Sequence, residues 1–140
     1  MMILTRNLQD RPVLASAALA RIAAVVDNRL GASEAGAGVA FVDDTEMSFL
    51  HGRFMDDPST TDVLSFPAEE AEYWGDVVVC TDQARRQARE LRHPYPYELA
   101  VLVLHGLLHL RGYDHVVDGG EMRRLEEALR PRCAAGGVLR

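Results

Sequence analysis

The chain has 140 residues, of which 48% are hydrophobic and 26% are charged, a balance typical of one soluble domain. It contains no run of the ~18–20 apolar residues that a membrane span needs, and its first residues lack the pattern of a secretory signal peptide. We therefore expect a cytoplasmic protein. Its two cysteines, Cys80 and Cys133, are too few for a disulfide framework. The formal net charge of −6 argues against a protein that coats nucleic acid by bulk electrostatics.

Charged side chains are unevenly distributed along the chain. Residues 42–76 contain ten acids and a single base, Arg53, so the net charge comes from this segment. A separate basic cluster follows it and consists of Arg85, Arg86, Arg89 and Arg92. Guanidinium groups bind phosphate in a bidentate manner, whereas codon bias in a GC-rich genome would give arginine in place of lysine without any ligand. Both interpretations stay open at the level of composition.

The first half of the chain alternates predicted strands and helices. A short strand over residues 1–4 precedes apolar residues at helical spacing, which predict a helix from near Pro12 to Gly31. A second strand over residues 39–42 leads to a helix over residues 45–54, and the acids Asp43 and Asp44 suit its start. Two further strands are expected over residues 63–66, closed by Pro67, and over residues 77–80, with an acidic loop between them.

The second half is predicted to be helical. Thr81 or Asp82 caps a helix that carries the arginine cluster on its outer face, and a strongly apolar helix spans residues 97–110. Asp118 and Glu121 form a capping box for a last helix, which ends before Pro131. We therefore predict a single α+β domain over residues 1–140, with about five helices packed against a small mixed sheet of about four strands.

Three of the five histidines fall within eleven residues, His105-Gly-Leu-Leu-His109-Leu-Arg-Gly112-Tyr-Asp-His115. His105 and His109 are four residues apart and lie on one face of a helix. Gly112 can adopt the positive φ that ends a helix, so that His115 approaches from the following loop. Three imidazoles with an open fourth position describe a catalytic zinc site at the end of the apolar helix, and another divalent transition metal is compatible with the same ligands.

Simpler interpretations exist for histidines in apolar helices. A lone histidine is usually a core residue with a satisfied hydrogen bond, and we interpret His51 and His93 in this way. A structural metal would need a fourth ligand, which Asp114 or a distant cysteine could supply. The spacing H-x3-H-x2-G-x2-H also occurs in metzincin proteases, which carry a glutamate general base directly after the first histidine. Here that position is Gly106, so a zinc peptidase is the minor alternative.

The histidine motif resembles that of the YbeY family of bacterial metal-dependent endoribonucleases. Two further blocks agree with this resemblance, Thr61-Asp-Val-Leu-Ser-Phe-Pro67 and Gly75-Asp-Val-Val-Val79. Many members of that family have an aromatic–arginine pair ahead of the first block, and its arginine is thought to serve RNA cleavage. Here the aligned pair is Phe54-Met55, and the nearest arginine is Arg53.

The resemblance implies a single-strand-specific endoribonuclease that acts in 16S ribosomal RNA 3′-end maturation and in ribosome quality control. It implies one zinc ion on His105, His109 and His115, with the small ribosomal subunit and assembly proteins as partners. Asp114 is the candidate base or orienting carboxylate, and Asp62 is another. Arg53, Arg85 and Arg89 are the candidate RNA contacts, and Tyr73, Trp74, Tyr95, Tyr97 and Tyr113 could stack on bases.

One alternative of a different class stays open, a ribosome-assembly factor whose metal is mainly structural. The net charge does not argue against either hypothesis, because binding depends on the local field and a divalent ion adds positive charge at the site. From the overall acidity we expect weak, salt-sensitive binding to naked RNA.

Overall fold

The computed structural model describes residues 1–57, 59–113 and 119–134. Four strands are found in this part of the chain, β1 (Met2–Asn7), β2 (Gly36–Val42), β3 (Val63–Glu70) and β4 (Tyr73–Cys80). The helices of the same residues are α1 (Ser16–Leu30), α2 (Asp44–Met55), α3 (Thr81–Leu91), α4 (Tyr95–Leu110) and α5 (Glu121–Ala134). The predicted α+β class is confirmed.

The four strands form one mixed sheet in the order β1-β2-β4-β3. β1 pairs parallel to β2, and β2 pairs parallel to β4. β3 pairs antiparallel to β4 in a hairpin, with Val63 opposite Val79 and Phe66 opposite Asp76. β3 is therefore an edge strand, because among the described residues it pairs with a strand on one side, that of β4.

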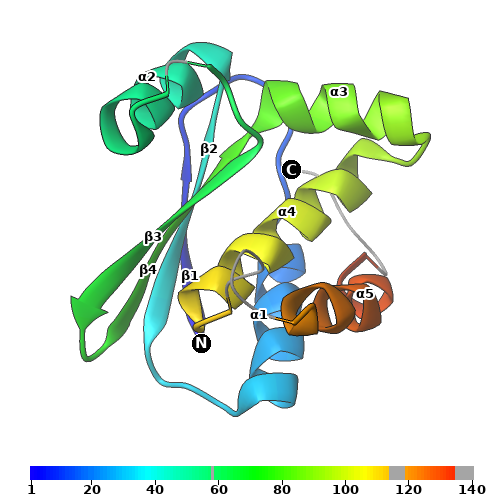
Figure 1. Ribbon diagram of the computed structural model, residues 1–140. Coiled ribbons are helices and arrows are strands. Elements are labelled where there is room, and N and C mark those ends of the chain that lie inside the picture. Colours follow the sequence, from blue (N-terminus) through cyan, green and yellow to red (C-terminus); the bar gives the residue numbers. More distant parts are fainter. Residues whose placement is uncertain (58, 114–118, 135–140) are drawn as a thin grey trace.

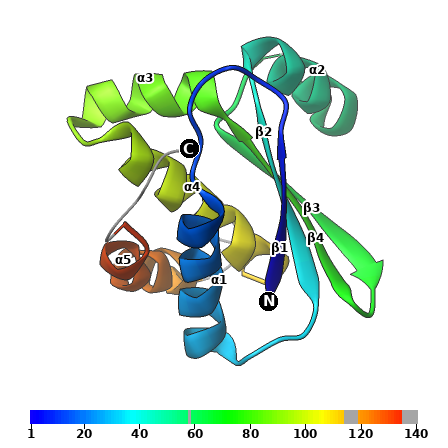
Figure 2. The ribbon, with the colours of Figure 1, turned by 180° about the vertical axis from the view of Figure 1, so that it is seen from behind.

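Helices pack on the two faces of the sheet unequally (Figures 1 and 2). α1, α4 and α5 gather on one face, where they enclose the main core together with β2 and β4. α2 lies against the other face, at the end of the sheet where β3 begins and β4 ends, away from the β3–β4 turn (Figure 1). It closes a smaller core there, made of Val42, Met47, Leu64, Val78 and Cys80. Most of this second face stays open. Among the described helices, none has the length and apolarity to cross a membrane.

α4 is the central helix of the molecule, because it contacts α1, α3, α5, β3 and β4. Pro96 lies in the first turn of the helix. A proline is tolerated there because the first N–H groups of a helix have no helical acceptor, so its missing N–H costs no hydrogen bond. The predicted start of this helix at residue 97 is therefore wrong by two residues, since the helix begins at Tyr95. Gly112 follows the helix with a φ of 101°, which confirms the predicted positive φ.

Other predicted boundaries are wrong as well: β2 and β4 begin earlier than expected, at Gly36 and Tyr73. Three further differences have identifiable reasons. β1 continues to Asn7 because its whole length pairs with β2. β3 continues through Pro67 to Glu70, so the expected acidic loop is a tight hairpin, and an edge strand tolerates a proline that cannot donate. α5 continues past Pro131 because its apolar face stays buried on both sides of the proline. Met122, Leu125 and Leu129 precede it, and Cys133 follows it.

The predicted helix caps were half right. Asp43 is the N-cap of α2 and accepts a hydrogen bond from the Glu46 N–H at 2.9 Å, as expected. α3 instead begins after Cys80, and neither Thr81 nor Asp82 caps it. The Thr81 hydroxyl lies 2.7 Å from Gln9 Oε1, whereas the Asp82 carboxylate accepts from the Asp44 N–H of α2 at 2.9 Å. Asp118 lies outside the described residues.

Candidate functional site

His105 and His109 interrupt the burial of α4. From Glu98 to Leu110 every residue is buried except these two histidines, which are partly exposed. Their Nε2 atoms lie 3.1 Å apart and their ring centroids 4.7 Å apart. The spacing of four residues therefore brings two imidazole nitrogens to one point, as the sequence predicted.

The two histidines line a cleft between α4 and the edge strand β3. The cavity measures about 560 Å³, and its other described walls are Met55, Thr61, Asp62, Val63, Leu64 and Ser65. Ser65 ties the two elements together, because its hydroxyl donates to the Gly106 carbonyl of α4 at 3.3 Å. The first five residues of the block, Thr61 to Ser65, thus contribute one wall of the histidine cleft.

Glu126 is a residue of this site that sequence reasoning missed. It comes from α5, is 8% exposed, and accepts a hydrogen bond from His105 Nδ1 at 2.6 Å. Its second oxygen accepts from Arg130 Nη2 at 2.8 Å. Burial raises the pKa of Glu126, but its contacts with His105 and the nearby Arg130 guanidinium outweigh burial, so the pKa is lowered overall. The sequence contains one sign of this role, because Glu126 lies on the same apolar helix face as Met122, Leu125 and Leu129.

The geometry of the two imidazoles fits a metal ion. Zinc–nitrogen bonds of ~2.0–2.1 Å at a tetrahedral angle place two ligand nitrogens about 3.3 Å apart, close to the observed 3.1 Å. His105 is held through Nδ1, and its Nε2 is the atom that lies beside His109 Nε2. The third predicted ligand, His115, and the candidate carboxylate Asp114 lie outside the described residues. Within the described ranges, no three ligand-type side chains converge on one point.

The remaining candidates for a ligand or a base occupy different places. Asp62 lines the cleft, but its Oδ1 accepts a hydrogen bond from the Val63 N–H at 2.8 Å, a local capping role. Cys80 is buried in the smaller core beside Asp44, and burial raises its pKa to about 11. Cys133 is buried in the main core. Neither cysteine belongs to the described lining of the cleft.

Gly106 shows why a glutamate base cannot occupy this position. A Cβ at residue 106 would lie 2.4 Å from Val77 Cγ1 and 2.8 Å from Cγ2, because α4 packs directly onto β4 there. Residue 106 therefore faces the sheet, whereas His105 and His109 face the cleft. The absence of the glutamate seen in zinc peptidases is a packing requirement, which leaves the peptidase alternative without support in this fold.

The candidate RNA-contacting arginines are not gathered at the histidines. Arg85 lines a small cavity with Tyr95, which is in the first turn of α4, whereas His105 and His109 lie in its second half. Arg89 is exposed on the same helix as Arg85. Arg86 of the same cluster forms a bidentate pair with Asp44 at 2.7 and 2.8 Å. That pair is largely exposed, and the hydrogen bond from Arg86 lowers the pKa of Asp44 to about 2.

The end of α2 distributes its side chains between two cavities. Met55 lines the histidine cleft, at the position where the sequence resemblance places an arginine. Phe54 lines a different cavity, and Arg53 is exposed with its guanidinium 5.8 Å from the Phe54 ring centroid. An arginine at position 55 would therefore extend from the wall of the histidine cleft, whose described lining does not include Arg53.

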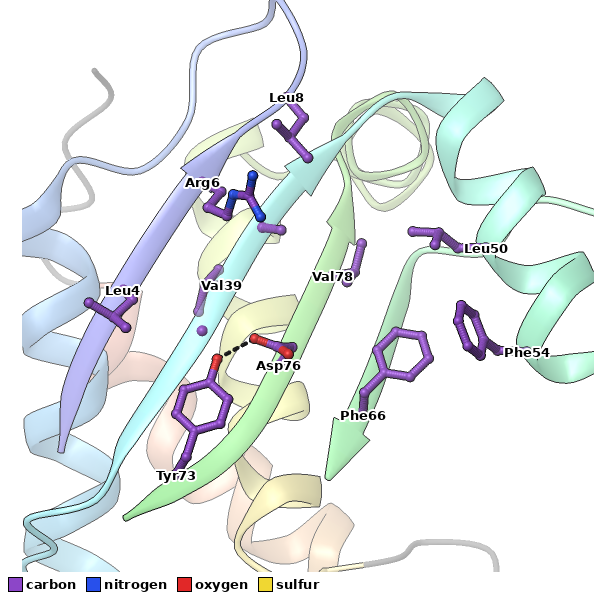
Figure 3. Close-up of a pocket in the computed structure, with 12 residues that line it drawn as sticks. Leu4, Arg6, Leu8, Val39, Leu50, Phe54, Phe66, Tyr73, Asp76 and Val78 are labelled. Atoms are coloured by element: carbon purple, nitrogen blue, oxygen red, sulfur yellow. Dashed lines mark hydrogen bonds between the residues drawn. The ribbon is translucent and has the colours of Figure 1, made fainter. Parts of the chain in front are cut away.

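The second cavity is an apolar groove on the open face of the sheet (Figure 3). It measures about 590 Å³, and Leu4, Leu8, Val78, Leu50, Phe54 and Phe66 make up most of its apolar wall. Its polar groups are Arg6, Tyr73 and Asp76, and the Tyr73 hydroxyl donates to the Asp76 carboxylate. Burial, followed by that hydrogen bond, raises the pKa of Tyr73 to about 12. The groove contains no histidine among its described residues.

His51 and His93 have the satisfied hydrogen bonds that the sequence suggested. His51 Nδ1 lies 2.8 Å from the Ser59 carbonyl, and His93 pairs with the buried Glu98. Both rings are partly exposed, so they are not core residues in the strict sense. Of the stacking candidates, Trp74 packs against Arg111 at 4.8 Å, and Tyr95 and Tyr113 pack against the main core.

Comparisons with known proteins agree with this architecture. The profile of the family described as Endoribonuclease YbeY matches residues 7–133. A solution structure from Thermotoga maritima superposes with a TM-score of 0.69 at 27% identity, and the match covers 96% of this chain and 90% of that one.

Several curated relatives carry the name Endoribonuclease YbeY. One from Nitratiruptor sp. is 48% identical over 90 residues, which is 63% of this chain and 62% of the relative. One from Acidothermus cellulolyticus is 42% identical over 98 residues, or 59% and 60% of the two chains. One from Beutenbergia cavernae is 44% identical over 110 residues, or 71% and 72%. The match thus spans less than two thirds of the length of the first two relatives.

Proposed function

Because this chain belongs to the endoribonuclease YbeY family, whose named members are hydrolases that act on RNA, we propose that it cleaves single-stranded RNA at one metal ion. His105, His109 and His115 would hold this ion. The observation that carries the proposal is the 3.1 Å separation of the His105 and His109 Nε2 atoms at the wall of a cleft. Neutral imidazoles in this arrangement suit zinc best, although other divalent transition metals share the preference for nitrogen.

Zinc held by three imidazoles would lower the pKa of a bound water to about 7 and would polarise a phosphoryl oxygen. The chain's own residues would hold the substrate and move the proton. Asp114 is the proposed base or orienting carboxylate, since it directly precedes the third ligand, and Asp62 is a second carboxylate in the cleft wall. Ser65 and Thr61 add hydroxyl groups along the same wall.

RNA would approach the cleft along the edge strand β3 and the end of α2. Arg53 is the basic residue nearest to this entrance in sequence, and Arg85 and Arg89 would contact phosphates farther along the surface. The net charge of −6 predicts that such binding is weak and salt-sensitive. Specificity would then come from the small ribosomal subunit and its assembly proteins, in 16S ribosomal RNA 3′-end maturation and ribosome quality control in the cytoplasm.

The proposal is tested by replacing one ligand. We expect His109→Ala to lose metal and RNA cleavage together, with a loss of affinity beyond the ~10–100-fold that the loss of an outer hydrogen-bond partner causes. His51→Ala, on α2 and outside the cleft, is the matched control and should retain both. The measurements are elemental analysis, circular dichroism and cleavage of single-stranded ribosomal RNA.

The result separates the two functions that the sequence left open. Cleavage by metal-loaded wild type and by His51→Ala, but not by His109→Ala, supports the nuclease. If folded, metal-loaded wild type cuts no RNA above background, the nuclease proposal is wrong and the metal has a structural role in an assembly factor.

A further inference from the structure

Glu126 occupies a position that a packing role alone does not require. It lies on the buried face of α5, between Met122 and Leu129, where an apolar side chain would satisfy the core. Both of its oxygens are used, Oε1 by His105 Nδ1 at 2.6 Å and Oε2 by Arg130 Nη2 at 2.8 Å. A buried carboxylate costs free energy unless it is paired and hydrogen-bonded, and here both conditions are met.

These contacts decide which nitrogen of His105 faces the cleft. A carboxylate paired with an arginine only accepts hydrogen bonds, so the proton between Glu126 and His105 belongs to Nδ1. The lone pair of neutral His105 is then on Nε2, the atom that lies 3.1 Å from His109 Nε2. Without the carboxylate, the ring could rotate about its side-chain torsions or carry its proton on Nε2.

We propose that Glu126, supported by Arg130, is the positioning residue that presents His105 Nε2 to the metal. The inference rests on the proposed metal site, and it adds α5 to that site. Glu126 is not among the described residues that line the cleft. It acts through His105, by fixing the ring orientation and the position of its proton.

α5 is built to hold Glu126 in place. Met122, Leu125, Leu129 and Cys133 anchor the helix in the main core, and α5 packs against both α4 and α1. Arg130 lies one turn beyond Glu126 and binds its second oxygen. This ion pair opposes a rotation of the carboxylate that would break the hydrogen bond to His105. The site therefore joins residues 21 positions apart in sequence through two packed helices.

The first test uses metal-free protein and does not depend on the metal at all. Two-dimensional NMR of the histidine ring nitrogens distinguishes the two neutral tautomers. We expect wild-type His105 to carry its proton on Nδ1, and Glu126→Ala to shift the population toward the Nε2–H form. A wild-type His105 that carries its proton on Nε2 would overturn the inference.

The second test measures metal affinity by competition with a chelator, and cobalt substitution reports the ligand geometry by its visible spectrum. We expect Glu126→Ala to bind zinc about 10–100-fold more weakly. Glu127→Ala is the matched control, since Glu127 is the next residue of α5 and pairs with exposed Arg123 instead of His105. Its affinity and cobalt spectrum should equal those of wild type.

Glu126→Gln keeps the shape and an accepting oxygen if Glu126→Ala does not fold. We expect the glutamine to retain part of the affinity, because the carbonyl oxygen can still accept from Nδ1. Equal zinc affinity and an unchanged tautomer in wild type and Glu126→Ala would refute the positioning role. Failure of wild type itself to bind zinc would instead count against the proposed metal site, while the tautomer measurement still judges Glu126.

Discussion

The two cavities beside β3 differ in chemistry although they share the same strand and the same helix end. Ser65 and Met55 face the histidine cleft, whereas their neighbours Phe66 and Phe54 face the apolar groove of the open sheet face. The cleft has two converging imidazoles and a buried carboxylate behind them. The groove is mostly apolar, with one phenol–carboxylate pair and Arg6.

For Ser65 and Phe66, the difference follows from the alternation of side chains along a strand. Phe54 and Met55 are successive residues of a helix, so their side chains project about 100° apart. Consecutive residues of β3 point to opposite faces, so one sequence block contributes to two unlike surfaces. A residue's place in a motif therefore does not tell which cavity it serves. Substitutions at neighbouring positions can separate the two cavities experimentally.

The largest expected effect concerns the packing behind the histidine cleft. Gly106→Ala places a Cβ 2.4 Å from Val77 Cγ1, a buried side chain with no room to move. Overpacking of this kind costs about 1–3 kcal/mol, so urea denaturation should show a lower free energy of unfolding. Zinc affinity should fall as well, because the shifted segment of α4 carries both histidines. Unchanged stability would contradict the close packing of α4 on β4.

The next effect compares neighbouring residues that face different cavities. Met55→Arg should raise the affinity for single-stranded RNA about tenfold, since a hydrogen bond to a charged group contributes about 1.5–3 kcal/mol before side-chain ordering is subtracted. Phe54→Arg adds the same charge but directs it to the groove, and should raise affinity much less. Fluorescence anisotropy with a cleavage-resistant 2′-O-methyl RNA measures both. Equal gains would mean that only total charge matters.

The smallest effect is confined to the groove. Asp76→Asn removes the charged acceptor of the Tyr73 hydroxyl, so the pKa of Tyr73 should fall from about 12 while staying above its ordinary value of 10.0, because burial remains. Carbon NMR of the labelled tyrosine rings up to about pH 11 follows this change. Zinc affinity should not change. A loss of zinc affinity would show that the two cavities are coupled through β3.

Much of the fold was predictable from local patterns, and the errors share one cause. The strands, the helices and the Asp43 cap were found from apolar spacing and capping residues. The predictions failed at Pro67, Thr81 and Pro131, where partners distant in sequence outweigh local preference. Pro67 lies on an edge strand, the Thr81 hydroxyl turns to Gln9, and the stretch around Pro131 stays helical because Leu129 and Cys133 are buried.

The sequence by itself determined that His105 and His109 share one face of an apolar helix, because a spacing of four residues is a property of helical geometry. Three short sequence blocks also identified the family, and the profile match over residues 7–133 confirms that assignment. Only the tertiary structure decided that Glu126 supports His105, that Gly106 lies against Val77, and that Met55 rather than Phe54 faces the histidines. Those contacts depend on how helices and strands pack against one another, and local spacing does not specify which faces meet.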